Sequence, residues 1–400
     1  MQVFFSAFKR SGLPTRLLAA CLAASSLQVL AVTAVQPLRD DEVVERLPAI
    51  TKFRAPRLSA LSPPPTPADA AGTTQQVRDA ISVARQTGDT RYWGRAQALL
   101  APWWDKPDAP ADLAILQATV QQGRHEFTAS RAVLTGALSR APNHAQGWLN
   151  LAALERLSAR YAESLAACAA VERAGQALYA QACRLETESL LGQQAQAEQG
   201  FQALLDRTRD AGQRSWLLSL LAESQERAGH DAQATTAYAA SLAAEPDLYT
   251  AIAFSDLLLR TGKAEQALRI LAPLPETDAV VLRRGTAWER LGDGRWTAQR
   301  QLLKERVQEQ QRRGDDITLH GRELALTALW LDDDPVAALP LATHNLRLQR
   351  EPVDWWIALQ SARLARQTAA FAETKAAITA AGLHDMRLTS TELAAPGASR

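Results

Sequence analysis

The 400-residue sequence lacks the short motifs that several classes of enzyme require. No glycine-rich loop that could cradle a phosphate is present, because Thr261-Gly262-Lys263 has no upstream glycine at the required spacing. The absence of a GxSxG pattern excludes a nucleophile elbow. His125-Glu126 has no second histidine at the spacing of a zinc-binding helix. These absences favour a non-catalytic protein that uses neither a cofactor nor a metal.

Three short patterns could carry chemistry, but each has a simpler interpretation. His320 and Glu323 could share a metal on a helix, yet no third ligand is near them in the sequence, which favours a surface pair. Asp332 to Asp334 precedes Pro335, as expected for a turn followed by a capped helix. Arg313-Gly314-Asp315 spells an adhesion tripeptide but occupies a position where a turn between helices is expected.

The sequence also lacks an excess of charge of either sign. Its formal net charge is +1, and residues 1–34 contribute three basic residues and no acids. The remaining 366 residues therefore hold 41 basic and 43 acidic residues, a net charge of −2. Phosphate backbones require a concentrated positive surface, so this balance argues against nucleic acid as the partner.

Residues 1–34 have the composition of an export signal. Arg10 and Arg16 end a basic start, and no charge occurs from Leu17 to Val32. Small residues at Val32-Thr33-Ala34 match a signal-peptidase site. The sequence thus predicts cleavage near Ala34 and a periplasmic or secreted protein.

Two alternatives to cleavage stay open. Leu18 to Cys21 resembles a lipoprotein cleavage box, although four apolar residues after Arg16 are fewer than the 7–15 or so of a signal core. An uncleaved anchor is the second alternative, because no charge occurs between Arg16 and Arg39. Polar residues such as Ser25 make that stretch a poor membrane span.

The rest of the chain divides into three parts. Residues 35–72 form a linker, because the run Pro63-Pro64-Pro65 and further prolines favour extended chain over helix. Residues 73–383 are predicted to form an array of helices. Residues 384–400 are polar, contain Pro396 and Gly397, and are expected to be a flexible tail.

The stretch from Ser215 to Pro246 represents the unit of this array. Apolar residues at Leu217, Leu218, Leu220 and Leu221 place one apolar face on a first helix, which Gly229 is expected to end. Asp231 is expected to cap a second helix. Two short helices cannot bury both apolar faces alone, so such units must stack on copies of themselves.

The unit resembles the tetratricopeptide repeat. Counted from Ser215, Leu218, Leu221, Ala222, Gly229, Ala234, Tyr238, Leu242 and Pro246 stand at defining places, and the pattern recurs along the chain. Phe127 and Tyr161, for example, are 34 residues apart, one repeat length. The resemblance implies an all-α fold, a right-handed superhelical solenoid of about nine antiparallel helix pairs. It also implies a concave groove that holds a peptide or a protein segment.

The resemblance assigns candidate groove residues by their place in the repeat. Trp216 stands at a groove-lining position, whereas most of the ten tryptophans are expected to fill gaps between helices. Two repeats contribute to the groove in this way, and their candidate residues are Gln146, Leu149, Ala153, Arg156, Trp216, Ser219, Glu223 and Glu226.

Three hypotheses for function follow. The first is a non-catalytic exported scaffold that binds a protein or peptide partner in the groove. The alternatives are an accessory subunit or enzyme of a cell-envelope process with a site between repeats, and a structural anchor in a membrane-associated complex. The stretches 88–103 and 346–356 resemble uncharacterised exported repeat proteins of proteobacteria, a resemblance that adds no activity.

Two of the three cysteines, Cys168 and Cys183, follow the signal. They lie on consecutive predicted helices at equal distances from the turn at Ala174-Gly175, so antiparallel packing brings them level. Paired cysteines of exported proteins tend to be joined, which predicts a structural disulfide. The alternative is two buried thiols that act as small apolar side chains.

Overall fold

The computed structural model describes residues 70–389, which fold into an all-α solenoid, as the sequence predicts. Within this range, 18 α-helices and two short 3₁₀ helices follow one another without a β-strand. The predicted signal peptide, nearly all of the predicted linker and residues 390–400 lie outside the described residues. No helix from residue 70 to 389 is both long and apolar enough to cross a membrane.

The α-helices are α1 (Ala70–Thr87), α2 (Arg91–Leu100), α3 (Ala111–Gly123), α4 (Phe127–Arg140), α5 (Ala145–Leu157), α6 (Tyr161–Arg173), α7 (Ala177–Leu190), α8 (Gln194–Arg207), α9 (Ala211–Arg227), α10 (Asp231–Ala244), α11 (Leu248–Arg260), α12 (Ala264–Leu271), α13 (Asp278–Arg290), α14 (Trp296–Arg313), α15 (Gly321–Trp330), α16 (Pro335–Leu348), α17 (Pro352–Leu364) and α18 (Thr368–Ala381). The 3₁₀ helices are η1 (Ile317–His320) and η2 (Met386–Leu388).

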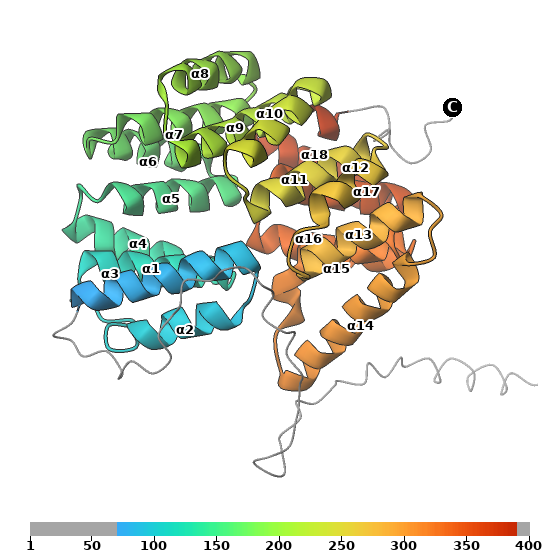
Figure 1. Ribbon diagram of the computed structural model, residues 1–400, viewed down its shortest axis with the longest axis horizontal. Helices are drawn as coiled ribbons and strands as arrows, with labels where there is room; N and C mark the ends of the chain where they lie inside the picture. Colours follow the sequence, from blue (N-terminus) through green and yellow to red (C-terminus); the bar gives the residue numbers. More distant parts are fainter. Residues whose placement is uncertain (1–69, 390–400) are drawn as a thin grey trace, which may run out of the picture.

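The α9–α10 pair shows how the predicted unit folds. Leu217 and Ala222 of α9 and Tyr238 of α10 are completely buried, and the Tyr238 ring stacks on Phe254 of α11 at 5.6 Å. Apolar residues of each pair thus pack against the next pair. Consecutive helices contact each other along most of the array, and apolar clusters extend from one pair into the next (Figure 1).

The turn inside this pair differs from the prediction by one residue. Gly229 ends the first helix in the left-handed conformation, with φ of +79°, as expected. The second helix begins at Asp231 itself, and the residue in the cap position is His230. The Asp231 carboxylate instead accepts a hydrogen bond from Arg260 of α11 at 2.7 Å, so its role is to join two pairs.

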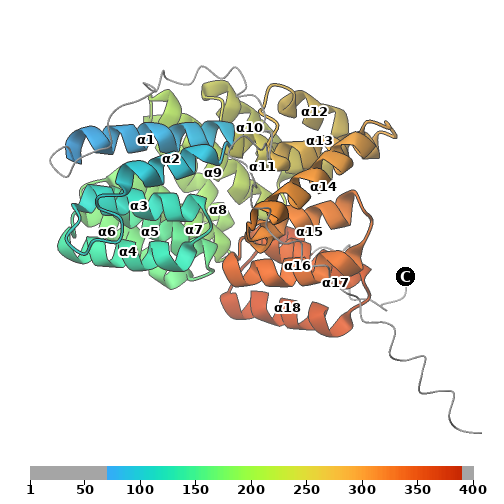
Figure 2. The same cartoon turned by 90° about the horizontal axis from the view of Figure 1, so that it is seen from below.

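The array curves until its first helix meets its eleventh. α1 contacts α11, and Gly88 after α1 lies against the start of the sixth and seventh pairs. A Cβ atom on Gly88 would lie 2.3 Å from Cγ2 of Thr277 and 3.8 Å from Cδ2 of Leu248. This close approach, together with φ of +65°, requires glycine at the position. Figure 2 shows α1 reaching toward α11, with α2 and α3 below it.

The last pairs also turn back onto the first half of the chain. The Arg350 amide donates a hydrogen bond to the Leu157 carbonyl at 2.7 Å, which joins the α16–α17 turn to the end of α5. The His125 ring of the α3–α4 turn lies 5.6 Å from the His320 ring of η1. The solenoid is therefore closed by contacts between residues far apart in sequence.

The start of the predicted flexible tail is part of this closure. The His384 amide donates to the Leu190 carbonyl at the end of α7 at 2.8 Å, and Leu388 is buried. Arg387 pairs with Asp385 at 2.6 Å and with Glu226 of α9 at 3.4 Å. We call residues 384–389 the C-terminal latch. The boundary expected at residue 383 is six residues too early, because these polar side chains find partners on distant helices rather than in solvent.

Candidate binding cavity

The first helices of the first six pairs surround a central cavity with two adjoining lobes. One lobe has a volume of about 490 Å³ and includes Tyr161; we call it the tyrosine lobe. The other has a volume of about 590 Å³ and includes Glu245 and Asp247; we call it the acidic lobe. Five residues line both lobes: Ala153, Arg156, Glu186, Glu223 and Tyr249.

Seven of the eight groove residues assigned from the sequence line the acidic lobe. They come from two first helices, α5 and α9. The first helix of the pair between them, α7, contacts both and also lines the lobe. The seven residues are Gln146, Leu149, Ala153, Arg156, Trp216, Ser219 and Glu223. Their meeting in one cavity follows from helical periodicity, because each set repeats at spacings of three or four residues.

Glu226, the eighth assigned residue, lies outside the cavity. Its carboxylate accepts hydrogen bonds from the Tyr238 hydroxyl at 2.8 Å and from Arg260 at 3.0 Å. The C-terminal latch adds Arg387 as a third partner. The assignment of Glu226 to the groove is therefore wrong, because the last turn of α9 rotates it toward the neighbouring pair and the latch.

An ion pair crosses the wall shared by the two lobes. Arg156 of α5 binds Glu186 of α7 at 2.7 Å, and both side chains are mostly buried. Next to them, the Tyr249 hydroxyl of α11 donates to a Glu223 oxygen at 2.9 Å. Arg227 lies 3.7 Å from the other oxygen of Glu223, too far for a strong pair. Charged groups from three inner helices and a hydroxyl from a fourth thus meet in the middle of the cavity.

Glu223 is the carboxyl group most affected by this setting. Enclosure by the surrounding helices raises its pKa to about 7, and the nearby Glu186 adds to the rise while Arg227 opposes it. Tyr249 exposes 57% of its surface and lines both lobes of the cavity. The negative charge of Glu223, together with enclosure, raises the pKa of the Tyr249 hydroxyl well above its usual value.

Aromatic rings form the opposite side of the acidic lobe. The Trp216 and Tyr179 rings lie 5.5 Å apart, and Gln213 donates to the Tyr179 hydroxyl at 3.1 Å. Trp216 is only partly buried, unlike Trp103 and Trp355, which pack into the core. Rigid rings beside carboxylates suit cationic or amphipathic groups.

The tyrosine lobe contains residues that sequence reasoning missed. Tyr161 is 4% exposed, and its hydroxyl has no hydrogen-bond partner in the described part of the chain. His125 lines the same lobe, where burial and the nearby His320 lower its pKa to about 4. Glu351, from the start of the ninth pair, completes the wall. Repeat position alone could not find these residues, because ring closure brings them together.

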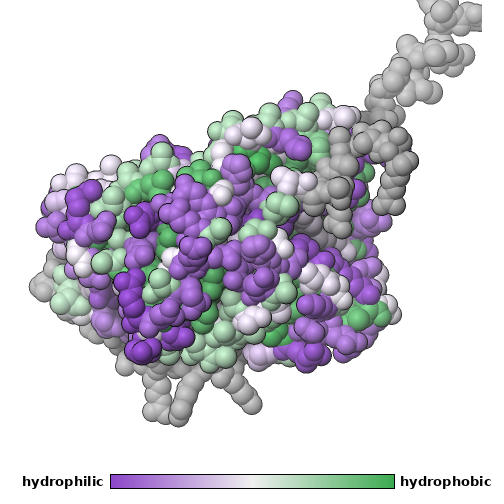
Figure 3. Space-filling view, turned by 90° about the horizontal axis from the view of Figure 1, so that it is seen from above, coloured by the Kyte–Doolittle hydropathy of each residue, from purple (hydrophilic) through white to green (hydrophobic). Residues whose placement is uncertain are grey.

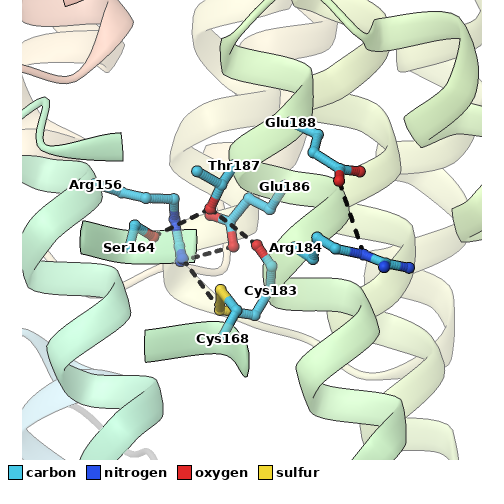
Figure 4. Close-up of a disulfide and its surroundings, with 8 residues drawn as sticks. All are labelled: Arg156, Ser164, Cys168, Cys183, Arg184, Glu186, Thr187 and Glu188. Carbon is cyan, nitrogen blue, oxygen red and sulfur yellow. Dashed lines mark hydrogen bonds and ion pairs between the residues drawn. A yellow bond between two sulfur atoms is a disulfide. The ribbon is translucent and has the colours of Figure 1, made fainter. Parts of the chain in front are cut away.

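Cys168 of α6 and Cys183 of α7 form a disulfide, with their Cα atoms 5.6 Å apart, as predicted. Figure 4 shows Arg156 of α5 pointing toward the bond, and Cys183 also lines the acidic lobe. Arg156 donates to the Cys183 sulfur at 3.7 Å as well as binding Glu186. The disulfide therefore joins α6 to α7, the helix that carries Glu186 of the central ion pair.

Two of the three patterns that the sequence favoured as structural have structural contacts. Arg313 pairs with Asp315 at 2.8 Å beside the end of α14. Asp334 caps α16 by accepting from the Ala337 amide, and Asp332 pairs with Arg300 and Lys304 of α14. Among residues 70–389, no group of three or more histidines, cysteines or acids is placed to hold a metal.

The helix pairs and the cavity that they enclose define the chain as a helical-repeat protein. No family model matches it, and no curated protein does. Among solved structures, the chain is similar to a tetratricopeptide repeat protein from Parabacteroides merdae ATCC 43184, with 16% sequence identity and a TM-score of 0.39. That match covers 60% of this chain and 98% of the other. The resemblance to exported proteins of proteobacteria stays a prediction.

Proposed function

We propose that the chain is a non-catalytic scaffold that binds a segment of a protein or peptide partner in the central cavity. The observation that supports this most directly is the cavity itself, a space lined by partly exposed aromatic, polar and charged side chains from the first helices of six pairs. Each lobe has a volume in the range of about 300–1,000 Å³ that is typical of pockets for small ligands. The space therefore suits a few residues of an extended chain rather than a folded domain.

The outer surface supports the same choice of site. Figure 3 shows one face of the molecule, on which hydrophilic residues predominate and apolar residues form only small patches. Stable docking of a folded partner usually involves a larger continuous apolar patch. The exposed large apolar residues Leu291, Val336 and Leu364 belong to different helix pairs.

A position-specific cross-link tests this proposal. A photo-crosslinking amino acid at Leu149 in the cavity should give a discrete adduct with a partner in cells that express the protein. The same amino acid at Glu172, which is exposed on the outer helix α6, is the matched control. Equal adducts from both positions, or an adduct only from Glu172, would contradict binding in the cavity.

We also propose that the protein is exported and that it acts in an oxidising compartment. The support is the signal-like composition of residues 1–34 together with the Cys168–Cys183 disulfide, a bond that persists mainly outside reducing compartments. Mass spectrometry of the exported protein should find an N-terminus near Val35. A lipid-modified Cys21 or a full-length cytoplasmic product would refute cleavage at Ala34.

A further inference from the structure

We propose that the acidic lobe binds a positively charged, extended peptide segment, with one lysine or arginine side chain between Glu223 and the ring of Tyr249 and a second near Glu245. This inference rests on the proposed function and specifies the chemistry of the partner. It is based on the charge, the aromatic lining and the size of the lobe.

Charge is unevenly distributed between the lobes. The acidic lobe is lined by Glu186, Glu223, Glu245 and Asp247, and Arg156 is the single basic residue among its described lining residues. Arg156 is already paired with Glu186. The tyrosine lobe, by contrast, has three arginines and three glutamates on its walls. The acidic lobe therefore has a negative surplus that a cationic side chain would balance.

The other three acidic side chains of the lobe differ in their hydrogen bonds. Asp247 caps α11 by accepting from the amide and hydroxyl of Thr250, both at 2.8 Å, so its position is fixed by the fold. Glu245 precedes it and is exposed toward the lobe. Glu223 holds the Tyr249 hydroxyl, so its carboxylate and the tyrosine ring are presented together. A cation beside Glu223 would contact its carboxylate and the Tyr249 ring, which adds a cation–π attraction, and Glu245 would attract a second cationic side chain of the same segment.

A second observation points independently to an occupant. Tyr161 is 4% exposed and lines the adjoining lobe, yet its hydroxyl has no partner among the described residues. A buried hydroxyl without a hydrogen bond is costly, and burial raises its pKa so that it stays neutral. The backbone of an extended segment that continues from the acidic lobe offers the carbonyl and amide groups that this hydroxyl lacks.

Binding of labelled probe peptides to the full-length mature protein tests the proposal. Three seven-residue peptides carry the same dye and differ only in containing three lysines, three glutamines or three glutamates. At about 0.15 M salt, where charges are screened beyond about 8 Å, we expect fluorescence anisotropy to show the lysine peptide binding at least about tenfold more tightly than the glutamate peptide.

A pair of double variants separates the lobe from the net charge of the protein. Glu223→Gln with Glu245→Gln should weaken binding of the lysine peptide about tenfold or more, because each carboxylate attracts a lysine side chain of the peptide. Glu172→Gln with Glu373→Gln removes the same charge from two exposed outer positions and should change the affinity less than about twofold. Thermal unfolding followed by circular dichroism confirms that both variants fold.

The pH dependence gives a further readout. Glu223 faces Glu186 from α7, Arg156 from α5 and Tyr249 from α11, with Arg227 on its own helix and Glu351 beyond. Because its pKa is about 7, its carboxylate fraction rises between pH 6 and 8, while lysine stays charged. Affinity for the lysine peptide should therefore increase over this range, and Glu223→Gln should remove the increase.

Three results would overturn the inference. They are tighter binding of the glutamate peptide, equal weakening by the two double variants, and no binding of the lysine peptide. If the cross-link from Leu149 nevertheless captures a partner, the scaffold function stands and only the proposed cationic chemistry fails. If the cross-link also fails, the proposed function fails with it.

Discussion

The α9–α10 pair and the C-terminal latch both bind α9, but they do so with different chemistry. In the pair, Leu217, Ala222 and Tyr238 are fully buried and make apolar contacts with neighbours close in sequence. The latch instead reaches α9 through Arg387, which pairs with Glu226 across about 160 residues of intervening chain and with Asp385 inside the latch. The comparison indicates that apolar periodicity builds each pair, whereas buried ion pairs decide where the curved array closes.

The largest loss of stability is expected for a substitution in the apolar core of α9. Leu221→Asp should destabilise the protein by roughly 4–5 kcal/mol, because it buries an unpaired charge at a position that is 6% exposed. Hydrogen exchange should show loss of protection concentrated in α7 to α12. Leu221→Met, which nearly conserves volume, is the control. Uniform loss from α1 to α18 would show that closure makes the ring one cooperative unit.

A smaller effect is expected at the latch. Arg387→Ala leaves Glu226 and Asp385 buried with less compensation, which should destabilise the closure by about 3 kcal/mol. Protease cleavage near residue 384 and hydrogen exchange at η2 and the end of α9 measure the effect. Arg347→Ala, at an exposed arginine of α16, is the matched control. Equal behaviour of the two variants would contradict a structural role for the latch.

The disulfide should contribute a similar or slightly smaller amount. Replacing Cys168 and Cys183 by alanine should lower stability by up to about 3 kcal/mol, the value for closing a loop of about 15 residues. Thiol labelling of the denatured, unreduced mature protein should find no reactive cysteine. Two labelled thiols would show that the bond does not form in the exported protein.

The smallest effect is expected where α1 meets the sixth and seventh pairs. Gly88→Ala should cost about 1–3 kcal/mol, because alanine disfavours φ of +65° and its Cβ would clash with Thr277. Melting temperature reports the cost, and accelerated exchange at the start of α11 reports its location. Gly94→Ala is the control, since a Cβ there has no atom within 4 Å. A stable Gly88→Ala protein would imply that the α1–α11 contact is dispensable.

The sequence predicts the features that depend on helices adjacent along the chain. It does not predict the contacts that form where the array closes on itself. The helix pairs, the turn at Gly229 and the Cys168–Cys183 bond follow from residue spacing. Residues three or four apart lie on one face of a helix, and residues equally far from a turn lie side by side on two antiparallel helices. Helical spacing likewise brings seven of the eight candidate groove residues to the acidic lobe. Glu226, Tyr161 and His125 were misassigned or overlooked, because their surroundings come from η1, the α16–α17 turn and the latch. No local pattern encodes which distant pair a curved array will meet.

Closure of the array limits the number of helix pairs that it can contain. An open solenoid can gain or lose a helix pair by duplication, because each new pair needs only a surface to stack on. Here Arg387 must meet Glu226, Arg350 must meet Leu157, and Gly88 must meet Thr277. One extra pair between α5 and α13 would shift these partners by the width of a pair and open the cavity. The number of repeats in this chain is therefore fixed by geometry, and homologous chains that keep the cavity should vary in loop length rather than in repeat count.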